Sequence, residues 1–234
     1  MLSEHEREAD ENLDAWRSKP LLRDIYAGFY ALIAAEIDAS RQGAIVELGS
    51  GIGNLAAFFP GVFTSDVFLR PWLDVVIDGY QLPFRAQTVS HLVAFDVFHH
   101  LERPAAFLAE ARRVLTAGGR LILLEPYISL TGLLVYGLLH PEPIAWRRGL
   151  DTGQEKPPPR YYAAQGNATR VFFGRESELW KDSWRVIARR RITSFAYLMS
   201  GGFSRPALYP ASALPAAECG RAPARASCRS SLPP

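Results

Sequence analysis

Apolar residues in the first half of the chain follow two patterns that alternate along it. Between residues 21 and 37 they recur every three or four positions, which is typical of an amphipathic helix. Farther on come short, nearly uncharged apolar runs, the pattern of strands buried on both faces of a parallel sheet. We expect five strands, at residues 44–48, 62–65, 74–77, 89–95 and 120–124.

Helices are expected between some of these strands. Leu55 to Phe59 is predicted to be helical and to stop at Pro60-Gly61. A second helix is expected to begin at Pro104, where the missing N–H costs nothing, and to end at Gly118-Gly119. Strands that alternate with helices favour an α/β fold, a doubly wound, mostly parallel sheet with helices on both faces.

The first strand leads into a glycine-rich stretch, E-L-G-S-G-I-G, at residues 47–53. Gly49, Gly51 and Gly53 allow the backbone to turn sharply and to approach a ligand closely, because no Cβ intervenes. The helix that follows would offer free N–H groups to the same ligand. The spacing is not the G-x-G-x-x-G of a dinucleotide site, where a third glycine would fall at Asn54.

Two acidic residues follow the next two predicted strands. Asp66 ends the second strand at the distance from the glycine loop where nucleotide-type folds bind ribose hydroxyls. A carboxylate suits a diol because it can only accept hydrogen bonds. A solvated loop aspartate is the alternative. Asp78 ends the third strand and begins the stretch D-G-Y-Q-L-P-F.

Taken in order, these motifs resemble those of the class I (Rossmann-like) S-adenosylmethionine-dependent methyltransferases. The resemblance runs from Ile45 to Pro126 and rests on E-x-G-x-G-x-G, on D-x-x-x-L-P-F and on the helix, G-G turn and strand that follow. It implies S-adenosylmethionine as the cofactor, with Asp66 on the ribose and Asp78 on the adenine amino group. It further implies that Gly49, Gly51 and Gly53 approach the amino-acid part and that Leu82 lies at the adenine, with Glu47 and Ser50 as further cofactor-binding residues.

Two histidines, His99 and His100, follow the fourth predicted strand. Histidine titrates in the range useful for a general base, which methyl transfer needs only when the acceptor must lose a proton. We expect His100, or otherwise His99, to lie on the acceptor side of the site. The alternative is that one histidine packs and the other binds a loop carbonyl. His91 is expected to be a packed histidine of the core or edge.

The function predicted on this basis is methyl transfer from S-adenosylmethionine to a small-molecule or lipid-like acceptor. A noncatalytic or regulatory protein that keeps the cofactor pocket is the alternative. A nicotinamide oxidoreductase is disfavoured by Asn54 in the place of the third glycine. The acceptor cannot be read from the sequence.

Composition narrows the range of partners. The net charge of +2 argues against a nucleic-acid partner. Cys219 and Cys228 are the two cysteines, so neither a disulfide scaffold nor a C-x-x-C zinc site is expected, and we predict no metal. The polar N-terminus shows no apolar signal segment, and residues 128–139 are apolar but too short to span a bilayer. A cytoplasmic protein without a transmembrane segment is expected; an oligomer is left open.

The chain is expected to form one methyltransferase-like domain over residues 1–215. Within it we distinguish N-terminal helices (1–40), a cofactor-binding core (44–126) and a lid or acceptor excursion (127–180), and residues 184–197 are predicted to form one more strand or strand pair.

Residues 216–234 contain prolines and no β-branched or aromatic residue, which predicts a disordered tail. The family usually ends with an antiparallel strand, so we expect that strand to be missing and hypothesise a frameshift near Glu218. A genuine tail, with the sheet completed in another way, is the alternative.

Overall fold

The computed structural model describes residues 4–127, 167–174, 180–192 and 195–208. The chain divides into two compact units, one made of Met1–Tyr26 with Ser194–Pro234 and the other of Ala27–Thr193. The expectation of a single domain over residues 1–215 stays a prediction. The apolar run 128–139, most of the expected lid and the tail 216–234 lie outside the described residues.

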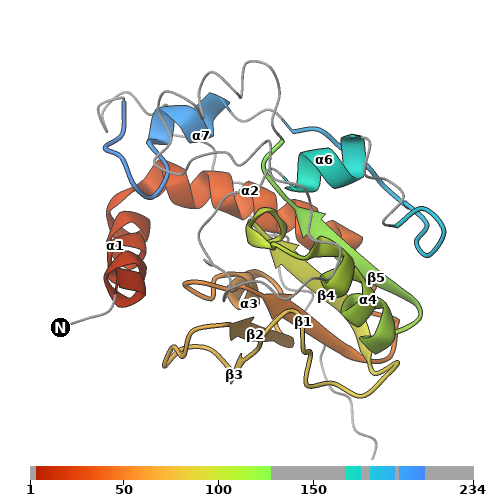
Figure 1. The fold of residues 1–234 in the computed structure, drawn as a ribbon. Coiled ribbons are helices and arrows are strands. Elements are labelled where there is room, and N and C mark those ends of the chain that lie inside the picture. Colours follow the sequence, from red (N-terminus) through yellow and green to blue (C-terminus); the bar gives the residue numbers. More distant parts are fainter. Residues whose placement is uncertain (1–3, 128–166, 175–179, 193–194, 209–234) are drawn as a thin grey trace, which may run out of the picture. The chain divides into compact units, whose positions relative to one another are not determined.

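The larger unit contains a parallel sheet of five strands in the order β3-β2-β1-β4-β5 (Figure 1). The strands are β1 (Ala44–Leu48), β2 (Val62–Asp66), β3 (Val75–Val76), β4 (Val89–Phe95) and β5 (Leu115–Leu124). Because all pairs are parallel, the carboxyl ends of the five strands lie along one edge. The strand order reverses between β1 and β4, and open α/β sheets bind ligands at such a point. The predicted parallel α/β sheet is confirmed.

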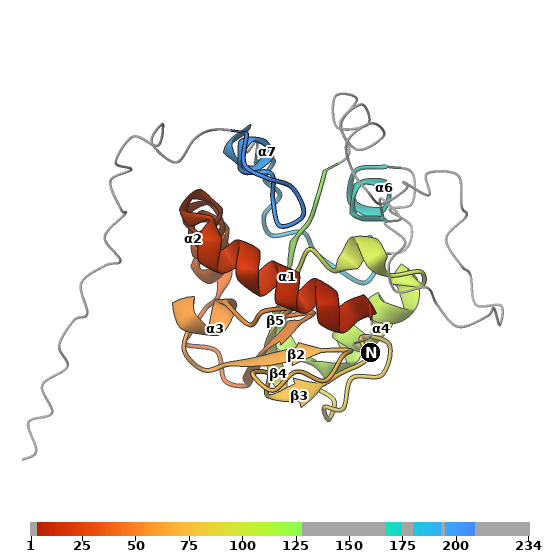
Figure 2. The same ribbon diagram turned by 90° about the vertical axis from the view of Figure 1, so that its left-hand side faces the viewer.

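Helices cover both faces of this sheet. On one face, α4 (Pro104–Val114) packs against β5, and its Phe107, Ala111 and Val114 join Val46 and Leu92 in the core. On the other face, the last turns of α2 (Pro20–Glu36) place Phe29 and Tyr30 against Phe95 of β4. The short α3 (Leu55–Phe58) lies beside β2 (Figure 2). The 3₁₀ turn η1 (Phe98–His100) contacts α6 (Asn167–Phe173).

The predicted end of one helix and the predicted start of the strand that follows it, residue 120, are both wrong. Helix α4 ends at Val114 rather than at Gly118-Gly119, because Leu115 already has extended backbone and pairs with Val89 of β4. The two glycines lie inside β5, where the register shifts between Val89 and His91 and where Gly118 has a φ of +72°. They therefore allow an irregularity within the strand.

The predicted strand over residues 184–197 is also wrong. Residues 184–192 have no regular secondary structure, and α7 (Phe195–Ser200) is a helix. Arg189 and Arg191 instead place their guanidinium groups over the ring of Phe173, and Arg190 pairs with Glu36. Cation–π contacts and an ion pair hold this segment, and a ladder of backbone hydrogen bonds does not. Within the described residues, no strand follows β5.

The smaller unit consists of α1 (Glu4–Ser18), the beginning of α2, and α7. Tyr26 packs edge-to-face against Trp16 and Phe203. Lys19 donates hydrogen bonds to the carbonyls of Gly202 and Arg205, just after α7. Within the residues described, no helix has both the length and the apolarity that crossing a membrane requires.

The glycine loop after β1 has the backbone that its sequence predicts. Gly49, Gly51 and Gly53 have φ angles of +64°, +52° and +74°. Residues other than glycine adopt this backbone region only at a cost in free energy. A Cβ at Gly49 would lie 2.3 Å from Cγ2 of Val97, in the loop after β4. A Cβ at Gly51 would meet nothing within 4 Å. Gly49 is therefore required for packing, whereas Gly51 borders open space.

This difference gives a matched pair of substitutions. Gly51→Ala adds only backbone strain and is expected to lower the free energy of unfolding by about 1 kcal/mol. Gly49→Ala adds the clash with Val97 as well, so we expect a loss of about 3 kcal/mol. Denaturant unfolding of both variants measures the difference. Equal losses would contradict the close packing of the loops after β1 and β4.

Candidate active site

Predicted site residues from four of the five strands meet at the carboxyl edge of the sheet. The glycine loop follows β1, Asp66 ends β2, Asp78 lies two residues after the end of β3, and His99 and His100 follow β4. Contact between the loops is direct at one point, where Gly49 faces the side chain of Val97. The structure thus places the expected cofactor residues and the two histidines on one edge of the same unit.

Hydrogen bonds tie the glycine loop to the end of β2. Ser50 N–H donates to the carbonyl of Ser65 over 2.7 Å, and Ser65 N–H donates to Oγ of Ser50 over 3.0 Å. The Gly51 N–H donates to Oδ2 of Asp66 over 3.1 Å. The carboxylate expected on the ribose therefore holds the loop in this structure. The sequence did not predict one further contact of this loop. Trp72 Nε1–H donates to the carbonyl of Gly51 over 2.9 Å.

Glu47 lies at the base of the loop and is 3% exposed. Burial, with a contribution from the negative charge of Asp66, raises the pKa of Glu47 to about 7, against a hydrogen bond from Ser50 that lowers it. Tyr30 of α2 lies near Glu47. Burial raises the pKa of the Tyr30 phenol, Glu47 adds to that rise, and a hydrogen bond with Asn54 opposes it. The periodic pattern of residues 21–37 predicted the helix, but it did not single out Tyr30 as a neighbour of the loop.

The segment from Asp78 to Phe84 is held from α4. Glu110 accepts a hydrogen bond from the Leu82 N–H, and Arg113 donates to the carbonyls of Leu82 and Phe84. Leu82 is 3% exposed and belongs to the core, so its side chain offers little surface to a ligand. Asp78 is exposed, and its carboxylate accepts from the N–H of Tyr80.

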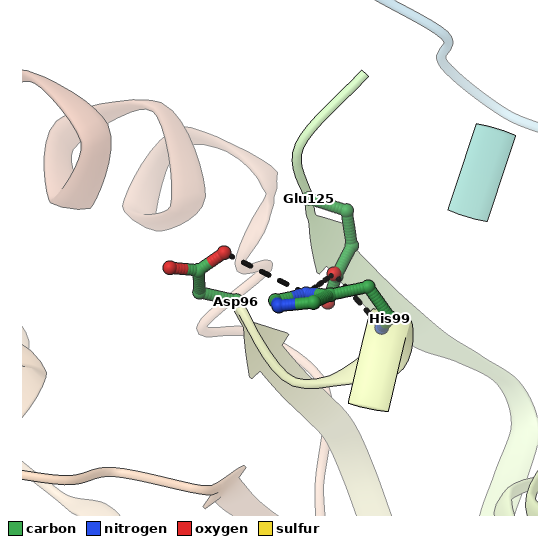
Figure 3. A group of neighbouring side chains, drawn as sticks. All are labelled: Asp96, His99 and Glu125. Atoms are coloured by element: carbon green, nitrogen blue, oxygen red, sulfur yellow. Dashed lines mark hydrogen bonds and ion pairs between the residues drawn. The ribbon is translucent and has the colours of Figure 1, made fainter. Parts of the chain in front are cut away.

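Glu125, directly after β5, organises the loop after β4. Its Oε1 accepts hydrogen bonds from the N–H groups of Val97 and Phe98, over 2.9 and 2.6 Å. Its Oε2 accepts from the N–H of His99, over 3.2 Å, and bonds Nδ1 of the same ring over 2.8 Å (Figure 3). The other hydrogen bonds at this carboxylate are all donated by backbone N–H groups. Because a carboxylate can only accept, we assign the ring proton to Nδ1, and Nε2 of the neutral ring is then the acceptor.

Asp96, His99 and Glu125 could each offer one metal-ligand atom, and these atoms lie within 4.8 Å of one another. However, Glu125 receives four hydrogen bonds, which use the lone pairs that a cation would need. The donor set therefore suits an oriented histidine better than a metal. Asp96 lies 3.6 Å from Nδ1 of His99, and its side chain is 45% exposed.

The two histidines after β4 differ in the contacts that hold their rings in place. His99 is 8% exposed and is fixed by Glu125 at both its backbone and its ring. The ring of His100 lies beside it, with the centroids 3.9 Å apart. The sequence analysis did not select Glu125 as a site residue. Its position after β5 is the same signal that singled out Asp66 and Asp78, and it could have been used for Glu125 as well.

His91 is a packed histidine of the core. It is fully buried in β4, and its Nε2 accepts a hydrogen bond from the N–H of Asp38 over 3.0 Å. The other ring nitrogen bonds Oγ of Ser90. The side chain is thereby satisfied inside the protein and lies apart from the candidate site.

Comparison with solved structures gives partial matches. A possible histamine N-methyltransferase from Thermotoga maritima matches at a TM-score of 0.43 and 19% identity, over 50% of this chain and 59% of the other. A putative S-adenosylmethionine-dependent methyltransferase from Methanococcus maripaludis matches at 0.38 and 16%, over 50% and 62%. The CurJ carbon methyltransferase matches at 0.34 and 19%, over 45% and 35%. At these values the likeness carries no argument about activity, and the chain spans less than two thirds of each structure.

No curated protein matches the chain. The family model described as "Methyltransferase domain" matches residues 46–123, about a third of the chain. This segment contains the glycine loop, Asp66, Asp78 and both histidines, together with nearly all of the five-stranded sheet. S-adenosylmethionine is the cofactor that this family implies. Residues 46–123 are therefore similar to the methyltransferase domain family.

Proposed function

We propose that this chain transfers a methyl group from S-adenosylmethionine to a small-molecule or lipid-like acceptor whose reacting atom first loses a proton to His99. The observation that carries the proposal is the 2.8 Å contact between Glu125 and Nδ1 of His99 at the edge of the sheet that also holds the glycine loop. A ring fixed in this way presents Nε2 as the proton acceptor.

The cofactor supplies a methyl group on a good leaving group, so the protein chiefly aligns the reactants. Glycine-loop N–H groups and the carboxylates of Asp66 and Asp78 are the proposed contacts with the cofactor. Gly51 supports this assignment, because the space beside it is open in the free protein. On cofactor binding, the carboxylate of Asp66 would accept hydrogen bonds from the ribose hydroxyls, either in place of the bond from the Gly51 N–H or in addition to it.

His99 replaces His100 as the preferred base in this proposal. Glu125 is a positioning residue: it accepts the Nδ1 proton, keeps the ring in one tautomer and stabilises the positive ring that forms after proton transfer. His100 has position alone in its favour. The enzyme is tested by incubating it with S-adenosylmethionine carrying a labelled methyl group and an extract of candidate acceptors. Cofactor binding without turnover in any extract would favour the noncatalytic alternative.

Cofactor contacts are tested by Asp66→Ala. The loss of charge-assisted hydrogen bonds is expected to weaken binding of S-adenosylmethionine by about 1.5–3 kcal/mol, measured by calorimetry. Asp74→Ala is the matched control, because Asp74 accepts hydrogen bonds from Thr64, two residues before Asp66, and has no proposed contact with the cofactor. Unchanged affinity in both Asp66→Ala and Gly51→Val would overturn the assignment.

The proposed base is tested by His99→Gln, with His100→Gln as the neighbouring control. We expect His99→Gln to lower kcat by roughly 10²–10⁴-fold while the KM for the cofactor changes little. Glu125→Gln is expected to lower kcat and to move the acidic limb of its pH profile, because it leaves the ring without its charged partner.

A merely structural Glu125 would change stability without moving that pH profile. If His100→Gln abolishes turnover while His99→Gln retains it, the base has been assigned to the wrong histidine.

A further inference from the structure

Arg189 and Arg191 form a positively charged patch that is backed by aromatic rings. The Cζ atoms of both arginines lie over the ring of Phe173, 5.0 and 5.1 Å from its centroid. Arg191 also lies over the ring of Tyr127, at 4.5 Å. Both arginines are exposed, and in the part of the chain that the structure describes neither guanidinium has a hydrogen bond or an ion pair. Each therefore keeps its five N–H donors for solvent or for a ligand.

The residue between these two arginines does have an acidic partner. Arg190 lies 2.9 Å from Oε1 of Glu36. The outer arginines instead hold two like charges over one ring, and these charges repel each other. An anion that contacts both guanidinium groups would offset this repulsion. A guanidinium presents its donors as a planar fork, which matches the oxygens of a carboxylate or a phosphate.

Two ring contacts place this patch beside η1, the turn that carries the proposed base. Phe172 of α6 packs against Phe98 of η1, with the ring centroids 5.3 Å apart. Tyr127 packs edge-to-face against Phe173 at 5.0 Å, and it follows Glu125 by only two residues. Figure 1 shows α6 beyond the carboxyl ends of β4 and β5. The patch and the proposed base therefore lie at the same edge of the sheet.

We propose that Arg189 and Arg191 bind an anionic group of the methyl acceptor, either a carboxylate or a phosphate. This inference rests on the proposed function, in which the reacting atom loses a proton to His99. A carboxylate has already lost its proton at neutral pH, so the reacting atom is a different one, and the anionic group keeps its bonds and its charge. The acceptor is then a small acid or an anionic lipid that also carries a protonated group, such as a hydroxyl or an amine. Anchoring of the anion holds that second group near the imidazole.

Anion binding is tested by calorimetry of the whole chain with benzoate, phenyl phosphate and the neutral benzyl alcohol. We expect at least one of the two anions to bind about tenfold more tightly than the alcohol. Its affinity is expected to fall as salt is added, because salt screens exposed charges. Vesicles of phosphatidylglycerol, with phosphatidylcholine as the control without net charge, present the same chemistry on a lipid, so the probe that binds distinguishes the two sources. If neither the small anions nor the anionic vesicles bind more tightly than their controls, the arginines are merely solvated and the inference is overturned.

Substitutions within three consecutive residues locate the site. Arg189→Ala and Arg191→Ala are each expected to weaken binding of the anionic probe about tenfold. Arg190→Ala is the matched control and is expected to keep it, because Arg190 already pairs with Glu36. Arg191→Lys keeps the charge without the fork, so its loss is expected to be smaller than that of Arg191→Ala. Affinity for S-adenosylmethionine is measured in each variant, since a loss of folding would lower it too. An equal loss in all three alanine variants indicates net charge alone and overturns the site.

The acceptor is tested by anion exchange. An extract of candidate acceptors is separated at neutral pH into retained and unretained fractions, and each is incubated with the chain and labelled S-adenosylmethionine. We expect methylation in the retained fraction, and in Arg191→Ala a higher KM for that acceptor with an unchanged KM for the cofactor. Methylation confined to the unretained fraction overturns the inference and leaves the proposed function standing. Anion binding that depends on both arginines, without methylation of either fraction, supports the anion site and counts against the proposed function.

Discussion

The contact between Gly49 and Val97 sets how closely the loops after β1 and β4 approach each other. No side chain fits at Gly49, because a Cβ there would lie 2.3 Å from Cγ2 of Val97. β1 and β4 are the strands between which the order of the sheet reverses. The amides of Val97 and Phe98 bond Glu125, so the loop after β5 joins the same contact network. One close approach thereby brings the ends of three strands together.

Much of the sheet could be predicted from the sequence because its signals are local. Apolar runs such as 89–95 have the length and composition of buried strands, and the φ angles of Gly49, Gly51 and Gly53 are those for which glycine is required. Errors arose where tertiary contacts override local signals. Gly118-Gly119 resembles a helix end, yet pairing of Leu115 with Val89 begins the strand before the glycines are reached. The segment 184–192 has β-branched residues but pairs with no strand in the part of the chain that the structure describes.

The candidate site was predictable one residue at a time, but not as a set of contacts. Asp66 and Asp78 could be placed at the sheet edge because they follow strands. Nothing local indicates that Glu125 bonds His99, 26 positions away, since only parallel pairing of β4 with β5 brings them together. Glu47 and Glu125 also differ in a way that sequence cannot show. Four hydrogen bonds reach Glu125, whereas Oε2 of Glu47 has no partner among the described residues.

One carboxylate holds both the backbone and the ring of His99, and this has a consequence for local stability. The amides of Val97, Phe98 and His99 and the imidazole cannot be released separately, because each depends on Glu125 staying in place. Opening of the turn and reorientation of the ring are therefore a single fluctuation with one free energy. Amide hydrogen exchange at these three positions reports on the ring as well. The entropy of fixing the imidazole is spent when the chain folds, before any ligand arrives.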